Sequence, residues 1–172
     1  NYFTRVIKPG DTVMDIGSNI GIHTITMANV VEQKGKVLAV EPTPRIYGIL
    51  EQNANLWNGT VIPVQAAVSS HDGEISRLQQ FEGGWSPLNT ITETARFEPG
   101  QRHRPEFVDV RTVTVDSLVR DRLGGRVSLI KIDVENAELT SVIFSMPWHF
   151  IVPDILFAEE LARNTFIYYS WV

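Results

Sequence analysis

The chain has 172 residues, of which 43% are hydrophobic and 20% are charged, and its formal net charge is −5. This length fits one domain with a single core, and the composition is ordinary for a globular protein. The negative charge argues against a general nucleic-acid binder, because such proteins usually carry a basic face. No apolar run approaches the roughly 18 residues that a membrane span needs. We therefore expect one domain over residues 1–172, with no nucleic-acid partner and no membrane span.

Cysteine is absent from the chain, which excludes disulfides and thiolate metal sites. The first five residues, 1–5, lack the charged, apolar and small segments whose order marks a signal peptide. Both features are typical of a protein in a reducing compartment. We predict a cytoplasmic location.

Strands and helices are predicted to alternate through the first third of the chain. Residues 12–16 form a short apolar run that predicts a buried strand, and apolar residues recur at helical spacing over 20–31. A second strand is expected at 36–41. The Thr-Pro pair at 43–44 then supplies an N-cap and the first residue of a second helix, and a third strand is expected at 61–66. This alternation predicts right-handed crossovers and a parallel sheet.

The stretch 69–113 interrupts the alternation. It is rich in glycine and proline, and residues 107–113 alternate between apolar and polar types. We expect an insertion made of loops and short antiparallel strands. A short helix is predicted to open at 114–118 and to end near the glycine pair at 124–125.

The remaining chain returns to the strand–helix pattern. A fourth strand is expected at 127–133, a helix from about Asn136 to Pro147, a fifth strand at 153–159 and a further strand over 165–172. The predicted fold is therefore α/β: a Rossmann-like, doubly wound, mostly parallel sheet with a β-rich insertion between the third and fourth strands. A full fold of this class adds a helix and a β-hairpin after the fifth strand. We therefore expect this chain to be a fragment, truncated at the C-terminus, or an unusually short member of this fold class.

Acidic residues stand at the ends of four of the predicted strands. In an open parallel sheet the ligand crevice lies beyond the carboxyl ends of the strands. Acids from four strands should therefore converge on one crevice. They are Asp15, Glu41, Asp133 and Glu159.

Glycines frame the turn that follows the first strand. Gly17 and Gly21 allow a close backbone approach to a ligand and otherwise strained angles. Glu41 lies 24 residues after Gly17, near the roughly 20 expected for an acid that binds ribose hydroxyls. The spacing indicates a ligand of the adenosine type.

The residues within the turn distinguish between adenosine ligands. Dinucleotide sites use Gly-x-Gly-x-x-Gly against a pyrophosphate, whereas the second and third glycine positions here are Asn19 and Ile22. Both side chains would crowd a pyrophosphate, and the carboxylate of Asp15 would repel it. An acid at this place suits the cationic amine of S-adenosylmethionine. Electrostatics therefore favours that cofactor over NAD, with an NAD-dependent oxidoreductase as an alternative.

Residues 13–21 resemble the first motif of class I methyltransferases in its Gly-x-Asn-x-Gly form, and 40–42 resemble the second motif. Residues 114–118 and 129–138 are together similar to FkbM-type methyltransferases, in which a Thr-(hydrophobic)-Asp-x-Leu segment precedes an Ile-Lys-Ile-Asp-Val-Glu-Gly-x-Glu segment. The resemblance runs from about Lys8 to Glu160. It departs from the family where Asn136 replaces the usual glycine, and Asn tolerates left-handed angles.

The resemblance implies S-adenosylmethionine as the cofactor. It implies that the adenine lies near Ala66 and Ala67, that Glu41 binds the ribose, and that Asp133 and Glu135 face the methyl group and the acceptor. The amino-acid end of the cofactor would be held by Asp15, Gly17, Asn19 and Gly21.

Methyl transfer to a hydroxyl usually needs a general base, and we predict that Asp133 or Glu135 provides it. In the alternative, Asp133 binds the ammonium of the cofactor and transfers no proton. The two acids could also hold a divalent metal through hard oxygens, but no histidine is near them in sequence, and no metal is predicted.

The predicted function is S-adenosylmethionine-dependent O-methylation of a small molecule or a sugar. The insertion 69–113 is expected to shape the acceptor cavity. A second alternative to this activity is a non-catalytic Rossmann-like domain that serves partner contact.

Overall fold

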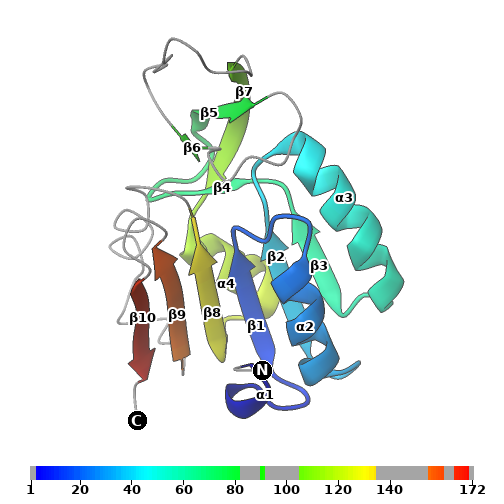
Figure 1. Cartoon of the computed structure of the whole chain (residues 1–172). Coiled ribbons are helices and arrows are strands. Elements are labelled where there is room, and N and C mark those ends of the chain that lie inside the picture. Colours follow the sequence, from blue (N-terminus) through cyan, green and yellow to red (C-terminus); the bar gives the residue numbers. More distant parts are fainter. Residues whose placement is uncertain (1–2, 82–89, 92–104, 135–154, 161–164, 171–172) are drawn as a thin grey trace.

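A layered arrangement of strands and helices is seen in the computed structural model, which describes residues 3–81, 90–91, 105–134, 155–160 and 165–170 (Figure 1). Every structural statement below concerns these residues. The helices are α1 (Phe3–Val6), α2 (Ile22–Val31), α3 (Pro44–Ala54), the 3-10 turn η1 (Asn55–Trp57) and α4 (Val115–Leu123). The strands are β1 (Thr12–Ile16), β2 (Lys36–Val40), β3 (Val61–Val64), β4 (Ala67–Val68), β5 (Ile75–Phe81), β6 (Thr90–Ile91), β7 (Pro105–Val113), β8 (Leu129–Asp133), β9 (Ile155–Glu160) and β10 (Thr165–Ser170).

The main sheet has six strands in the order β10-β9-β8-β1-β2-β3. Neighbouring strands are parallel except β10, which pairs with β9 in the antiparallel sense. The predicted parallel Rossmann-like sheet is thus confirmed, as is a further strand after the fifth. In its centre, Asp15 of β1 lies opposite Ala39 of β2 and Lys131 of β8. The register therefore sets a carboxylate and a lysine side by side on neighbouring strands.

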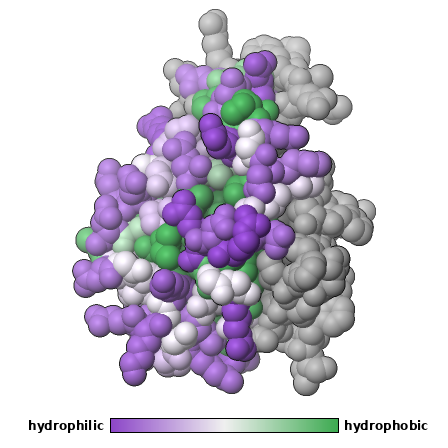
Figure 2. All heavy atoms as spheres, turned by 180° about the vertical axis from the view of Figure 1, so that it is seen from behind, coloured by the Kyte–Doolittle hydropathy of each residue, from purple (hydrophilic) through white to green (hydrophobic). Residues whose placement is uncertain are grey.

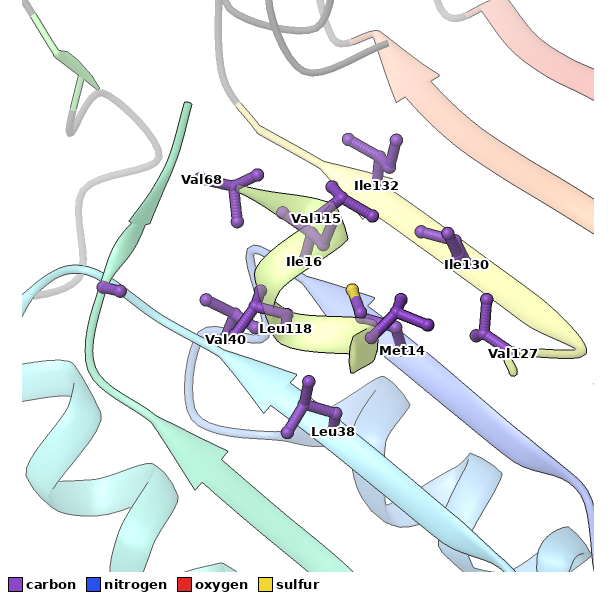
Figure 3. Close-up of a cluster of buried hydrophobic side chains, with 12 residues drawn as sticks. Met14, Ile16, Leu38, Val40, Val68, Val115, Leu118, Val127, Ile130 and Ile132 are labelled. Carbon is purple, nitrogen blue, oxygen red and sulfur yellow. The ribbon is translucent and has the colours of Figure 1, made fainter. Parts of the chain in front are cut away.

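Successive side chains of the central strands point to opposite faces of the sheet. From β1, Met14 and Ile16 lie on the face that α4 covers (Figure 3). They pack with Leu38 of β2, Leu118 of α4 and Ile130 of β8. Each large apolar side chain that leaves water in this way stabilises the fold by about 1.5–3 kcal/mol.

Helices α1, α2 and α3 cover the opposite face (Figure 1). Val13 of β1 packs there with Met27 and Val31 of α2 and Leu50 of α3. Asp15 has the same parity along β1 as Val13, so its carboxylate points under α2 rather than into the α4 side of the core. Apolar cores on both faces make β1, β2 and β8 a rigid platform, at whose carboxyl ends the candidate site lies.

Among the described residues, the strands of the insertion join β4, which directly precedes them, in a second sheet with the order β4-β7-β5-β6. The antiparallel pairing of β5 with β7 confirms the predicted β-rich insertion. The expectation of uniformly short strands is wrong, because β7 runs over nine residues. The third strand was expected to continue to Ala66, but it ends at Val64, since Ala67 turns away to pair with Thr112 of β7.

Both ends of the insertion are tied together at the base of α4. Thr114 caps this helix, its side chain accepting a hydrogen bond from Ser117 N, and Gly124 ends it with φ 71° as the sequence predicts. Asp72 accepts hydrogen bonds from the Thr114 amide (2.7 Å) and the Ser117 hydroxyl (2.6 Å). These bonds hold the pKa of Asp72 below its usual value, with the Ser117 bond contributing most.

The predicted helix from about Asn136 to Pro147 lies outside the described residues. The surface seen in Figure 2 is mostly hydrophilic, with smaller apolar areas between polar ones. The most exposed large apolar side chains are Leu56 of η1, Ile22 of α2 and Ile75 of β5. Among the described helices, none is both long and apolar enough to cross a membrane.

Candidate active site

A turn with left-handed backbone angles joins β1 to α2. Gly17, Asn19 and Gly21 have φ values of 74°, 52° and 96°. The helix predicted from Ile20 consequently begins only at Ile22. A Cβ atom at Gly17 would overlap the carbonyl oxygen of Asp133, so the turn packs directly against the end of β8.

Hydrogen bonds with two other segments fix this turn. The amides of Gly17 and Ser18 both donate to the carbonyl oxygen of Val40, each at 3.0 Å. The side chain of Asn53 in α3 donates to the carbonyl oxygen of Ile20 (2.8 Å). The turn is thus held in shape by β2 and α3.

Glu41 lies directly beside the turn, as its position after β2 predicts. One carboxylate oxygen accepts a hydrogen bond from Asn19 N (3.0 Å), and the other accepts one from Thr43 N (2.9 Å). The side chain is buried, and this burial raises the pKa of Glu41, opposed in part by the bonds from Thr43 and Asn19. Glu41 therefore presents a carboxylate of fixed orientation at the edge of the turn.

Asp15 lies underneath the turn and has no exposed surface. Its Oδ2 accepts a hydrogen bond from the hydroxyl of Thr24 (2.5 Å), and its Oδ1 lies 3.1 Å from Nζ of Lys131. Within the described part of the chain, Oδ1 has no hydrogen-bond partner of good geometry, so the ion pair alone compensates its charge. The charge of Asp15 is thus balanced inside the protein.

Asp133 completes a cluster of three charges. Its Oδ2 lies 3.2 Å from Nζ of Lys131, and its side chain is 26% exposed, against 2% for Lys131. Burial works against the charged form of Lys131, but the carboxylates of Asp15 and Asp133 outweigh it and raise the pKa of this lysine. We name these three residues the Asp15–Lys131–Asp133 cluster; it carries one net negative charge and is exposed through Asp133.

The sequence analysis overlooked Lys131 and Thr24. A signal for the lysine existed, because it stands between Ile130 and Ile132 in an apolar strand. A fully buried lysine is rare unless an acid pairs with it, and the aligned strand already offered one. Thr24 carried no such signal, since a threonine in a helix is unremarkable by itself.

The other predicted site residues are placed as follows. Ala67 is buried and packs with Leu78 and Val110 of the insertion. The backbone of Glu159 in β9 stands opposite Asp133, consistent with strand ends that converge. Glu135 lies outside the described residues. No group of three or more metal-binding side chains occurs among the residues that the structure describes.

Comparison with known proteins decides the family. A family model described as the methyltransferase FkbM domain matches residues 15–157. The chain belongs to the FkbM methyltransferase family. The match includes the glycine turn, the insertion and all three members of the Asp15–Lys131–Asp133 cluster.

Two curated relatives are named as methyltransferases. The hexuronic acid methyltransferase AglP of Haloferax volcanii is 33% identical over 75% of this chain and 47% of its own length. The methyltransferase sdnD of Sordaria araneosa is 31% identical, over 74% of this chain and 57% of its own length. The chain thus spans about half the length of the curated relatives that it matches.

Solved structures share the fold. An FkbM methyltransferase from Methylobacillus flagellatus has a TM-score of 0.53 at 15% identity, covering 92% of this chain and 39% of that one. An O-methyltransferase from Bacillus cereus, crystallised in complex with SAH, has a TM-score of 0.55 at 14% identity, covering 94% and 56%. At these identities the likeness concerns the fold alone.

The glycine turn between β1 and α2 is unsuited to a pyrophosphate. A helix N-terminus binds phosphate through free backbone amides. Here the amide of Ile20 donates to the side-chain oxygen of Asn19 (2.7 Å), and the exposed apolar side chain of Ile22 stands at the start of α2. A fixed carboxylate and a cluster with one negative charge fit a ligand with hydroxyls and a positive charge instead.

A hollow of about 260 Å³ lies where β3, β7 and α4 meet. Gln65 and Ala66 line it on one side, and Arg111 and Arg122 line it on the other. It reaches Val64, whose carbonyl oxygen accepts a hydrogen bond from the Glu41 amide (3.1 Å). The hollow therefore lies next to the end of β3, the strand that is bonded to the Glu41 backbone.

Proposed function

We propose that this domain binds S-adenosylmethionine at the glycine turn and transfers its methyl group to a hydroxyl of a small molecule or a sugar. The observation that carries the proposal is the carboxylate of Glu41, fixed against Asn19 and adjoining a cluster with one net negative charge. Family membership supports it. Because the chain covers only about half of its curated relatives, the activity of the whole protein is part of the proposal.

Each part of the site has a proposed role in binding. Glu41 would accept hydrogen bonds from the ribose hydroxyls, since a carboxylate oxygen can accept more than the one bond that each makes here. Gly17, Asn19 and Gly21 would form the bed for the amino-acid end, and Asp15, buried beneath the turn, would support this bed from below. The adenine would lie near Ala66 and Ala67, and the hollow that Ala66 lines supports the Ala66 part of this assignment.

The chemistry needs little from the protein beyond orientation and the removal of a proton. S-adenosylmethionine supplies a methyl group bonded to a sulfonium sulfur. Asp133 is the exposed member of its cluster and the described acid that can meet an acceptor hydroxyl and take its proton. Glu135, two residues further along, is the other proposed base. If Asp133 instead binds the ammonium of the cofactor, Glu135 takes the proton.

The acceptor proposed first is a sugar, because the relative from Haloferax volcanii is a hexuronic acid methyltransferase. The net charge of −5 disfavours a nucleic-acid acceptor. A cytoplasmic location completes the proposal. Incubation with methyl-labelled cofactor and sugar acceptors, uronic acids among them, tests the reaction; a label that stays on the cofactor with every acceptor counts against it.

The cofactor is tested first and separately. A calorimetric titration with S-adenosylhomocysteine should show micromolar affinity, which corresponds to about −8 kcal/mol and requires a formed pocket. NAD, titrated in parallel, should not bind. A folded sample that binds NAD but not S-adenosylhomocysteine would point to an oxidoreductase. Binding of neither would favour a non-catalytic domain.

A further inference from the structure

The ammonium of Lys131 has three N–H donors and three oxygen neighbours. Oδ1 of Asp15 lies at 3.1 Å, Oδ2 of Asp133 at 3.2 Å and the carbonyl oxygen of Gly17 at 3.4 Å. These oxygens come from β1, from β8 and from the turn between β1 and α2. The lysine therefore joins the turn to the end of the strand that carries Asp133.

Exposure within the cluster is unequal. The side chains of Asp15 and Lys131 are 0% and 2% exposed, whereas that of Asp133 is 26% exposed. A ligand at the carboxyl ends of the strands can therefore contact Asp133 but not Lys131. Lys131 can therefore affect a ligand only through the Asp133 carboxylate with which it is paired.

We propose that Lys131 is a positioning residue that fixes the Asp133 carboxylate against the glycine turn, so that Asp133 binds the cationic end of the cofactor. This inference rests on the function proposed above, in the form in which Asp133 binds the ammonium and Glu135 takes the proton. If Lys131 served only to compensate the charge of Asp15, Asp133 would not need to lie 3.2 Å from the same nitrogen. An ion pair that served only the core could be replaced by neutral residues of similar volume at little cost in stability, so the two roles are separable.

A double-mutant cycle separates them. Asp133→Asn is introduced into the wild-type chain and into the Asp15→Asn/Lys131→Met background, which removes one charge of each sign and keeps the volumes. The affinity for S-adenosylmethionine is measured by calorimetry without any acceptor. Asp133→Asn should weaken binding on the order of tenfold in the wild type, the size of a partly screened charge interaction, and by less than about twofold in the neutral background.

Equal losses in the two backgrounds, or no loss in the wild type, overturn the role of Lys131 and leave the proposed function intact. A wild-type chain that binds neither S-adenosylmethionine nor S-adenosylhomocysteine overturns the proposed function and this inference with it. Thermal unfolding of each variant confirms that it is folded. If the Met background does not fold, Asp15→Asn/Lys131→Gln takes its place, because a glutamine amide can still donate to the Gly17 carbonyl oxygen. Lys36→Met, at an exposed position of β2, is the matched control and should bind like the wild type.

Discussion

Gly17 offers the sharpest test of how the turn packs on the sheet. Gly17→Ala adds one methyl group at a residue with φ 74°, and this methyl would overlap the carbonyl oxygen of Asp133. A matched control exists in Gly59, whose φ is 85° and whose added Cβ would meet nothing within 4 Å. The two substitutions share the backbone strain and differ in the overlap.

The structure sets the expected magnitudes. A left-handed angle costs a non-glycine residue about 1–2 kcal/mol, so Gly59→Ala should lower the free energy of unfolding by that amount. Gly17→Ala should cost a further 1–3 kcal/mol or so, the usual range for overpacking, because a backbone oxygen cannot rotate away. In a domain of this size the difference corresponds to a Tm on the order of 5 °C lower for Gly17→Ala than for Gly59→Ala.

Urea unfolding followed by circular dichroism measures both variants under one set of conditions. Equal destabilisation by the two substitutions would refute the reasoning, since it would show that Gly17 and β8 are not in contact. The same experiment on Gly21→Ala should give an intermediate value, because its φ is 96° and its nearest neighbour is the flexible side chain of Leu50.

Three further predictions concern the acids of the site and of the insertion. Glu41→Ala should weaken S-adenosylhomocysteine binding by about 1–3 kcal/mol, measured by calorimetry, because ribose hydroxyls would lose their acceptor; unchanged affinity removes Glu41 from the site. Thr24→Val should lower the free energy of unfolding by about 1–3 kcal/mol by leaving a buried carboxylate oxygen unpaired, whereas Thr26→Val, on the exposed side of the same helix, should change it by less than about 0.5 kcal/mol. Asp72 has a lowered pKa in the folded state, so its stabilisation is present above the ordinary value of 3.8 and is lost as the pH falls through the folded value. The stability difference between wild type and Asp72→Asn should therefore shrink below about pH 4 in acid titrations of unfolding, and a difference that grows there would contradict the assignment.

Short-range patterns predicted the elements well because they depend on neighbouring residues. The apolar run at 12–16 and the caps at Thr114 and Gly124 specify their elements locally, and the structure has them where expected. The apolar spacing predicts a helix from residue 20, two residues before α2 begins, because such spacing contains no information on the left-handed angles of Asn19 and Gly21. The turn is bonded to Val40 at the end of β2 and to Glu41 directly after it, and both are distant in sequence.

Long-range pairing explains what the sequence did not predict. Ala67 continues an apolar run after β3, and only its pairing with Thr112, more than forty residues away, moves it into the second sheet. In the same way, Asp15 looks in sequence like a free acid beside a ligand. Its pairing with Lys131 depends on the parallel register of β1 and β8, which no local pattern encodes.

Hydrogen bonds close the insertion where the chain leaves the main fold and returns to it. Thr114 N donates to Asp72, the Thr112 hydroxyl donates to the His71 carbonyl oxygen, and Ser69 N donates to the Val113 carbonyl oxygen. A segment closed at its root can change in length or composition with little entropic cost to the rest of the domain. The glycine turn and the Asp15–Lys131–Asp133 cluster are built from β1, β8 and the turn after β1, away from this root. The length of the insertion can therefore change without displacing the glycine turn or the cluster.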